Sequence, residues 1–402
     1  MKIMVITMPC FGDTVPMLGF MEELTKRGHQ VDLVSSSYSM PKIRDYLKNT
    51  SVNFIDFDVE RLENYQPGRE VTIWDTAEVF SLQIEDVSNK AEEYDAVIYD
   101  YFAFPMYQLL KDKKVCSIRY FANFAFNETI RRRMFESDEK DSPQTKHALY
   151  VGGGVIEQMS ARGVEFRYGN FGEEIVNNVP DLTIVHTLKE LQPYGEEFSE
   201  QFAYVGACAT PPAEEKCEIP FDQMKGKIIY VSFGTIQSEM GDGRMGVFRM
   251  IMEALRDEDV SVIIAMGWKH TLEDFGNVPE NVYLYSFVPQ AEVLQHADLF
   301  IMHCGMNSTN DAVYYGVPMI GIPGGYDQPL TAELLEKRGM GKEIKLEDVT
   351  VDCLRETIFD ILVNKEIYDN VKALSAKMRS VDCDKRTADL IEEYIEKGEK
   401  TL

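Results

Sequence analysis

Three short groups of glycine and polar residues lie within one stretch of the chain. Each follows an apolar run of the kind expected for a buried strand. The groups read Phe287-Val288-Pro289-Gln290, His303-Cys304-Gly305-Met306-Asn307-Ser308-Thr309 and Pro323-Gly324-Gly325-Tyr326-Asp327-Gln328. Three such groups in succession are harder to obtain by chance than one glycine motif. They indicate a binding site for a phosphorylated ligand.

The middle group has the features of an anion site. Leu299–Cys304 is predicted to be a strand and Asn307–Tyr315 a helix, so the residues between them lie at a helix start. Free backbone N–H groups and the positive end of the helix dipole favour a diphosphate there. Gly305 lets the backbone come close to the anion because it has no Cβ. His303 would add a donor to the same oxygens.

The charge of that diphosphate would have to be met by neutral groups. No lysine or arginine occurs between Phe287 and Gln328. Helix dipoles, hydroxyls, the Asn307 amide and the His303 imidazole would serve instead. Neutral donors can suffice when they are preorganised.

A sugar nucleotide fits the remaining residues better than other phosphorylated ligands. The stretch contains neither a P-loop pattern nor the Gly-x-Gly-x-x-Gly of a dinucleotide fold. Phe287 can stack on a base, Gln290 can bond a base edge or ribose, and Asp311 can accept from ribose hydroxyls. Asp327 and Gln328 offer acceptors and donors suited to the hydroxyls of a sugar.

The elements that must position these residues alternate between strand and helix. Lys2–Thr7, Met17–Arg27 and Gln30–Ser35 form a β-α-β unit, which is typical of a parallel, doubly wound sheet. The pattern continues with Asp95–Tyr99, and Asp181–His186 is predicted to be the last strand of the first half. A second series then supplies strands at Lys227–Phe233, Ser261–Gly267, Val282–Phe287, Leu299–Cys304 and Met319–Pro323, with helices such as Met245–Arg256 and Glu333–Arg338.

We therefore expect an α/β protein of two Rossmann-like domains. Residues 1–206 form the first, 207–220 a linker, 221–385 the second and 386–402 a C-terminal helix. Ligands of open α/β sheets bind beyond the carboxyl ends of the strands. The polar residues and glycines at such ends predict a site in a cleft between the domains. They are Gly12, Asp13, Asp100, Gly234, Thr235, His303 and Pro323–Gln328.

One segment of the first half breaks the alternating pattern. Arg131–Gln144 is charged and loses periodicity, and Gly152-Gly153-Gly154 follows it. We predict a mobile excursion between strands here, which could act as a lid over a second substrate.

Composition narrows the class of partner and compartment. The 402 residues carry a net charge of −26, from 41 basic and 67 acidic side chains, which argues against nucleic acid and against anionic lipid. Seven scattered cysteines without a Cys-x-x-Cys pair make a zinc site or a disulfide framework unexpected, so we expect a reducing cytoplasm. Met1–Cys10 is too short to cross a bilayer and lacks a cleavage site, so we read it as a core strand.

On the basis of these residues, the chain resembles the macrolide/UDP-glycosyltransferase family, which is family 1 of the glycosyltransferases. The architecture of this family is called GT-B. The resemblance also includes Leu191-Gln192-Pro193 and Tyr204-Val205-Gly206 and reaches Ile344. It implies transfer of a hexose from a UDP- or TDP-sugar to a small lipophilic acceptor, with inversion and without a metal or other cofactor. The donor-binding positions that it implies are Gly12, Gly234, Thr235, Phe287, Val288, Gln290, His303, Gly305, Asn307, Ser308, Thr309, Asp311, Asp327 and Gln328.

The first half departs from the family pattern at the catalytic position. Members usually carry Gly-His-x-x-Pro after the first strand, whereas this chain has Gly12-Asp13-Thr14-Val15-Pro16. Asp13, paired with Asp100, is the candidate base. A lone aspartate carboxyl has a pKa of about 4. A second carboxylate nearby would raise the pKa of Asp13, whereas the dipole of the helix predicted to begin near Pro16 would lower it. Asp13 as a simple helix cap is the competing interpretation.

Other functions remain open on the sequence alone. The missing histidine is also compatible with a non-catalytic sugar-nucleotide-binding subunit or sensor. A transferase selective for amines or acidic phenols would need no strong base. Epimerisation of the nucleotide sugar is a third possibility.

Overall fold

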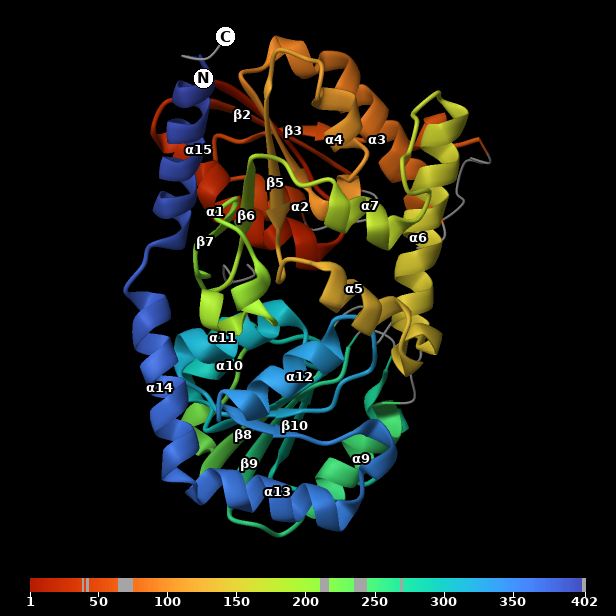
Figure 1. The fold of residues 1–402 in the computed structure, drawn as a ribbon. Helices are drawn as coiled ribbons and strands as arrows, with labels where there is room; N and C mark the ends of the chain where they lie inside the picture. The colour runs from red at the N-terminus through yellow and green to blue at the C-terminus, as the bar shows by residue number, and fades with distance from the viewer. Residues whose placement is uncertain are drawn as a thin grey trace. The chain divides into compact units, whose positions relative to one another are not determined.

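The computed structural model describes residues 1–37, 40, 43–63, 75–209, 217–234, 244–267 and 270–399 (Figure 1). The chain divides into two compact units. Unit 1 comprises Met1–Asp141, Thr145–Cys208 and Val381–Leu402, and unit 2 comprises Ser142–Gln144 and Ala209–Ser380. Each unit is built on its own parallel sheet, so the chain has the two-domain α/β organisation expected from the sequence.

The sheet of unit 1 has seven parallel strands in the order β3-β2-β1-β4-β5-β6-β7. Their bounds are β1 Lys2–Ile6, β2 Gln30–Ser35, β3 Asn53–Asp56, β4 Ala96–Asp100, β5 Cys116–Phe121, β6 Leu182–Val185 and β7 Phe202–Tyr204. The α-helices are α1 Phe11–Lys26, α2 Ile43–Leu47, α3 Thr76–Lys90, α4 Met106–Leu110, α5 Glu128–Phe135, α6 Pro143–Ala161, α7 Phe171–Asn177 and α15 Cys383–Glu399. Strands such as β1 and β4 are buried along almost their whole length, as parallel strands covered on both faces must be.

The sheet of unit 2 has six parallel strands in the order β10-β9-β8-β11-β12-β13. Their bounds are β8 Lys227–Ser232, β9 Val260–Ala265, β10 Val282–Tyr285, β11 Leu299–Met302, β12 Met319–Gly321 and β13 Gly341–Glu343. The helices are α9 Arg244–Ala254, α10 Gln290–His296, α11 Met306–Tyr315, α12 Gln328–Lys337, α13 Val351–Val363 and α14 Lys365–Arg379.

The strand order of both sheets reverses at one point. In unit 1 the chain moves outward from β1 to β2 and β3, and then returns to place β4 on the other side of β1. In unit 2, β8 and β11 stand in the same relation. Such switch points leave a crevice beyond the carboxyl ends of the two central strands, where open α/β sheets bind their ligands.

The last helix belongs to unit 1 and not to the core of unit 2. Ala388, Ile391 and Ile395 of α15 share a buried cluster with residues of α1 such as Phe20. Glu392 accepts hydrogen bonds from Arg27 and from the His29 ring, each at 2.6 Å. The return of the chain to unit 1 begins at Val381, inside the range assigned to the second domain from the sequence.

The segment that follows Arg131 lies between β5 and β6 and is largely helical, although its sequence lacks helical periodicity. The segment contains α5 and the start of α6, and the glycine triplet lies inside α6. The glycines allow close packing instead of a turn. A Cβ on Gly152 would lie 2.3 Å from Cγ of Phe171, and one on Gly154 would lie 2.7 Å from Cβ of Ala77. The strand Asp181–His186 is likewise not the last of its sheet, because β7 follows it.

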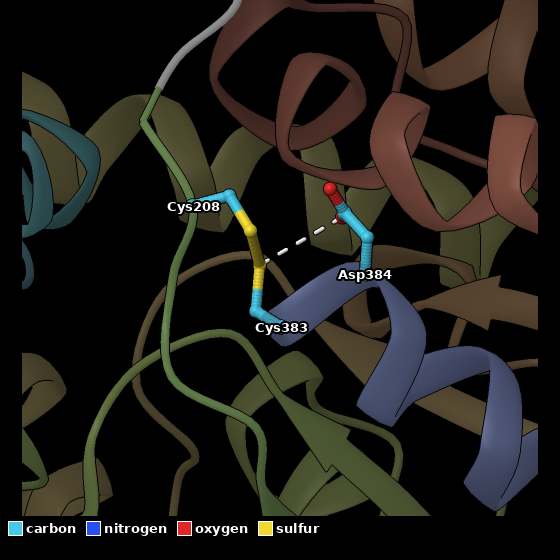
Figure 2. A group of neighbouring side chains, drawn as sticks. All are labelled: Cys208, Cys383 and Asp384. Carbon is cyan, nitrogen blue, oxygen red and sulfur yellow. Dashed lines mark hydrogen bonds between the residues drawn. A yellow bond between two sulfur atoms is a disulfide. The ribbon is translucent and has the colours of Figure 1, made fainter. Parts of the chain in front are cut away.

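The sequence made a disulfide framework unexpected, and the structure contains one disulfide within the described residues. Cys208 and Cys383 are joined, with Cα atoms 5.9 Å apart (Figure 2). They are 175 positions apart in the sequence, so spacing gave no sign of the pair. They meet because Cys208 ends the main part of unit 1 and Cys383 begins the helix that returns to it. The inference of a reducing compartment therefore loses its premise.

Among the described residues, none of the helices is both long and apolar enough to cross a membrane.

Candidate active site

The switch point of unit 1 brings the two predicted catalytic carboxylates to one place. Asp100 is the last residue of β4, and Asp13 lies in the first turn of α1, just after β1. The two strands pair with Ile6 opposite Tyr99. Asp100 is fully buried, and its Oδ1 accepts from the backbone N–H of Phe102 at 2.8 Å. Its Oδ2 has no hydrogen-bond partner within the described residues.

The helix that carries Asp13 begins earlier than the sequence suggested. It starts at Phe11, so Pro16 lies inside it. Asp13 is therefore not the N-cap; that position is held by Cys10, and no side chain makes a capping hydrogen bond. The interpretation of Asp13 as a simple cap is wrong.

Cys10 is a site residue that the sequence analysis missed. Its Sγ donates to Oδ2 of Asp13 at 2.7 Å. Burial, and then the charge of Asp13, raise the pKa of the Cys10 thiol well above its usual value, so it stays protonated and remains a donor. A thiol three positions before a helix-start carboxylate was the available signal.

Burial decides the protonation of the two carboxyls. Removal from water raises the pKa of Asp13 to about 6, with the Cys10 hydrogen bond acting in the opposite direction. Burial, and then the charge of Asp13, raise the pKa of Asp100 well above its usual value. The two groups titrate as a coupled pair. Burial favours a proton held on the pair, and the Cys10 hydrogen bond favours the ionised form of Asp13.

The switch point of unit 2 holds the predicted diphosphate residues. Gly234 follows β8 and His303 follows β11, and these strands pair with Ser232 opposite Met302. Two glycines flank the imidazole: a Cβ on Gly234 would lie 2.7 Å from Cε1 of His303, and a Cβ on Gly305 would lie 2.4 Å from Nε2. Real Cβ atoms do not approach that closely, so both glycines are needed to seat the ring.

The imidazole of His303 is neutral at physiological pH. Burial, and then the charge of Arg244, lower its pKa to about 3. Its Nδ1 is buried and has no partner within the described residues. Cys304, the next residue, has φ = 66°, a left-handed conformation that is uncommon for a side chain other than glycine. Strained backbone of this kind concentrates at functional sites.

The helix α11 presents its start at the same place. Gly305 is its N-cap, and no side-chain hydrogen bond caps it. Asn307 and Ser308 lie in the first turn and are half-buried. Thr309 is buried, and its hydroxyl donates to the Gly305 carbonyl at 3.1 Å, so this side chain supports the turn.

The residues predicted to hold the nucleoside contact each other. Gln290 begins α10, and its Nε2 donates to Oδ2 of Asp311 at 2.7 Å. Asp311 is 1% exposed, so the amide fixes a buried carboxylate. Phe287 is half-buried, whereas Val288 is buried.

The residues predicted to hold the sugar lie at the start of α12. Asp327 directly precedes the helix and Gln328 is its first residue. The Oε1 of Gln328 accepts from the backbone N–H of Gly324 at 2.8 Å, which closes the loop on itself. Tyr326 has φ = 64°, the second strained residue in the predicted donor site.

Two of the predicted donor-binding residues stand apart from this group. Thr235 falls outside the described residues. Gly12 is exposed in the first turn of α1 and belongs to unit 1 with Asp13, whereas the other described donor-site residues belong to unit 2.

One cluster has the composition of a metal site. Within the described residues, Cys208, Cys383 and Asp384 bring two sulfurs and a carboxylate within 4.8 Å of one another. The sulfurs are bonded to each other, and Oδ1 of Asp384 lies 3.7 Å from Sγ of Cys383 (Figure 2). As a disulfide, the pair offers no thiolate to a metal.

Comparisons with known proteins agree with this architecture. The family model for the erythromycin biosynthesis protein CIII-like C-terminal domain matches residues 249–394. The uncharacterized UDP-glucosyltransferase YojK of Bacillus subtilis (strain 168) is 27% identical over 411 residues, covering 98% of this chain and 97% of its own. Oleandomycin glycosyltransferase of Streptomyces antibioticus is 24% identical over 410 residues, covering 97% of this chain and 90% of its own. The crystal structure of CalG4, the calicheamicin glycosyltransferase, has a TM-score of 0.73 at 23% identity and covers 98% of both chains.

The fold and these relatives define a glycosyltransferase with the GT-B fold, an enzyme that takes its sugar from a nucleotide sugar. The comparisons support a family 1 glycosyltransferase, of the macrolide/UDP-glycosyltransferase family, in agreement with the resemblance in the sequence. The alternative of a non-catalytic binding protein is therefore set aside.

Proposed function

We propose that this enzyme transfers a hexose from a UDP-sugar, or a TDP-sugar, to a hydroxyl of a small, largely apolar acceptor, with inversion at the anomeric carbon and without a metal. The observation that carries the proposal is the Asp13–Asp100 pair at the switch point of unit 1. It supplies a carboxylate with a pKa of about 6, which is far better matched to a proton transfer near pH 7 than an ordinary aspartate.

The reaction follows from these groups as a single displacement. Asp13 takes the proton of the acceptor hydroxyl as its oxygen attacks the anomeric carbon, and the bond from that carbon to the diphosphate oxygen breaks. The UDP leaves with both electrons of that bond. The N–H groups at the start of α11 and the neutral imidazole of His303 would stabilise the charge that develops on it. Attack opposite the leaving group inverts the anomeric configuration.

The donor class is supported by the relatives and by the site. YojK is named as a UDP-glucosyltransferase. The bonded pair Gln290 and Asp311 would present an amide and a carboxylate to the base and ribose. Asp327 and Gln328, at the start of α12, would contact the sugar.

The acceptor class is supported by the same comparisons. Oleandomycin glycosyltransferase is named for oleandomycin. The net charge of −26 disfavours polyanionic acceptors. A transferase selective for amines or acidic phenols stays as the second candidate, because an aspartate stands where the family usually has histidine and such acceptors need less help to lose a proton.

The experiment is an assay of the purified protein with UDP-glucose and a panel of macrolides, phenols and amines. The expected result is free UDP together with an acceptor that gains one hexose by mass. The anomeric coupling constant of the product, measured by NMR, reports inversion. Turnover that persists in EDTA supports the metal-free reaction, and loss of turnover restored by Mg²⁺ or Mn²⁺ contradicts it. Transfer to amines and acidic phenols alone favours the second candidate.

A further inference from the structure

The first residue of α9 is a buried arginine that lies outside the predicted donor stretch. Arg244 is 4% exposed. Its Nη1 donates to the carbonyl of Ile322 at 2.8 Å. Its guanidinium carbon lies 4.9 Å from the centre of the Phe233 ring, within cation–π range. These contacts hold the planar group on two sides.

The contacts place the guanidinium at the carboxyl ends of the central strands of unit 2. Phe233 directly follows β8 and Ile322 directly follows β12, and β11 lies between these strands in the sheet. The residue that follows β11 is His303. Burial, and then the charge of Arg244, lower the pKa of His303. Burial raises the pKa of Cys304, and the charge of Arg244 opposes that rise. The cation is therefore within electrostatic reach of the predicted diphosphate residues.

This arrangement supplies the charge that the donor stretch lacks. No lysine or arginine occurs between Phe287 and Gln328, although the leaving group is a polyanion. A positive charge removed from bulk water acts more strongly on a nearby anion than one at the surface. Burial keeps Arg244 from being screened by salt as a surface arginine would be.

We propose that Arg244 is a positioning residue of the diphosphate subsite, whose fixed positive charge draws the diphosphate onto His303 and the start of α11. The inference rests on the proposed function, because it assumes that a nucleoside diphosphate is the donor's leaving group. The charge also disfavours a second cation on His303, so the ring stays a neutral donor. Arg244 thereby raises affinity for the phosphates and not for the nucleoside.

The test separates charge from scaffolding by comparing two probes, uridine and UDP, in calorimetry. The variants are Arg244→Gln, which removes the charge, and Arg244→Lys, which keeps it. Arg249→Gln is the matched control, because Arg249 lies on the same helix but is exposed and donates to the carbonyl of Asp274. Thermal unfolding of each variant checks that it is folded.

The charge model predicts a selective loss. In Arg244→Gln, the affinity for UDP should fall by about tenfold while that for uridine changes by less than about twofold, since only the phosphates feel the missing charge. Arg244→Lys keeps the positive charge without the planar guanidinium, so it should retain more UDP affinity than Arg244→Gln. Arg249→Gln should bind both probes like wild type. The kcat with saturating donor should fall in Arg244→Gln as well, because the charge on departing UDP grows in the transition state.

Three results would contradict the Arg244 inference or the diphosphate site on which it rests. Equal losses for UDP and uridine in Arg244→Gln would show a purely structural role and overturn the inference. A folded Arg244→Lys variant that loses the preference for UDP over uridine would overturn it too, and this variant carries the test if Arg244→Gln does not fold. Wild-type protein that does not prefer UDP to uridine would instead contradict the proposed diphosphate site itself.

Discussion

The thiol of Cys10 donates a hydrogen bond to Oδ2 of Asp13, with 2.7 Å between the two atoms. A donor to a carboxylate stabilises its charged form, so this bond lowers the pKa of Asp13 while burial raises it. The balance leaves a carboxyl that titrates just below neutral pH. One thiol therefore helps to set the pH range over which the proposed base is ionised.

Replacing Asp13 tests the base directly. Asp13→Asn should lower kcat/KM for a hydroxyl acceptor by about 10²- to 10⁴-fold, the range for loss of a general base. In the wild type, kcat/KM should rise with pH through the Asp13 pKa of about 6, because only the ionised form accepts a proton. Steady-state rates between pH 5 and 8 measure both effects. Full turnover by Asp13→Asn at neutral pH would exclude the role.

Replacing Cys10 should move the same pH profile. In Cys10→Ala, the lost hydrogen bond should raise the Asp13 pKa and shift the rising limb to higher pH. Cys10→Ser keeps a hydrogen-bond donor, so it should shift the rising limb of the pH profile less than Cys10→Ala does. The readout is the midpoint of the limb, which a change in packing alone would leave in place.

The buried carboxyl of Asp100 should make stability depend on pH. Its folded pKa lies above the unfolded value, so the ionised form is disfavoured in the fold, and its contribution to the free energy of unfolding declines as pH rises above the unfolded pKa. Asp100→Asn removes this titration. The stability of the variant relative to wild type should be greater at pH 8 than at pH 4. Urea denaturation at the two pH values measures the difference, and an unchanged difference would contradict the assignment.

The glycines beside His303 should tolerate no side chain. In Gly305→Ala, the new Cβ would overlap Nε2 of the ring and displace it, so UDP affinity should fall by about tenfold or more. Gly246→Ala is the matched control, because a Cβ there meets no atom within 4 Å. It should leave UDP binding unchanged and stabilise α9 by about 0.5–1 kcal/mol. Calorimetry with UDP and thermal unfolding provide the two readouts, and wild-type affinity in Gly305→Ala would contradict the seating of the ring.

The disulfide should be detectable in the oxidised protein. Thiol titration of the unfolded, unreduced chain should find five free cysteines, and tryptic mapping should yield one peptide pair containing Cys208 and Cys383. Cys208→Ser should lower the free energy of unfolding by about 2–4 kcal/mol under oxidising conditions. The same variant should differ little from wild type when both are reduced. Seven free thiols in the oxidised sample would contradict the pairing.

Local sequence patterns were enough to locate most of the strands that carry the site. Apolar runs of four to six residues followed by glycine identified β1, β8, β11 and β12, because a strand buried on both faces must be apolar along its length. The short strand β13 was not predicted, because its residues Gly341, Lys342 and Glu343 form no apolar run. It is a strand because it pairs with β12. The residues of α5 and α6 were not predicted to be helical. Glycine favours a turn, but it also occurs in a helix where another element packs closely, and the sequence does not distinguish the two cases.

Local periodicity and residues close together in the chain were enough to predict the fold class, the family resemblance and the donor stretch from 287 to 328. The meeting of residues that are distant in the chain depends on the three-dimensional fold. The fold joined Asp13 to Asp100 and to Cys10, and it brought Arg244 within reach of His303. It also closed the bond between Cys208 and Cys383. Strand order and burial set these neighbours, and with them the pKa values on which the chemistry depends.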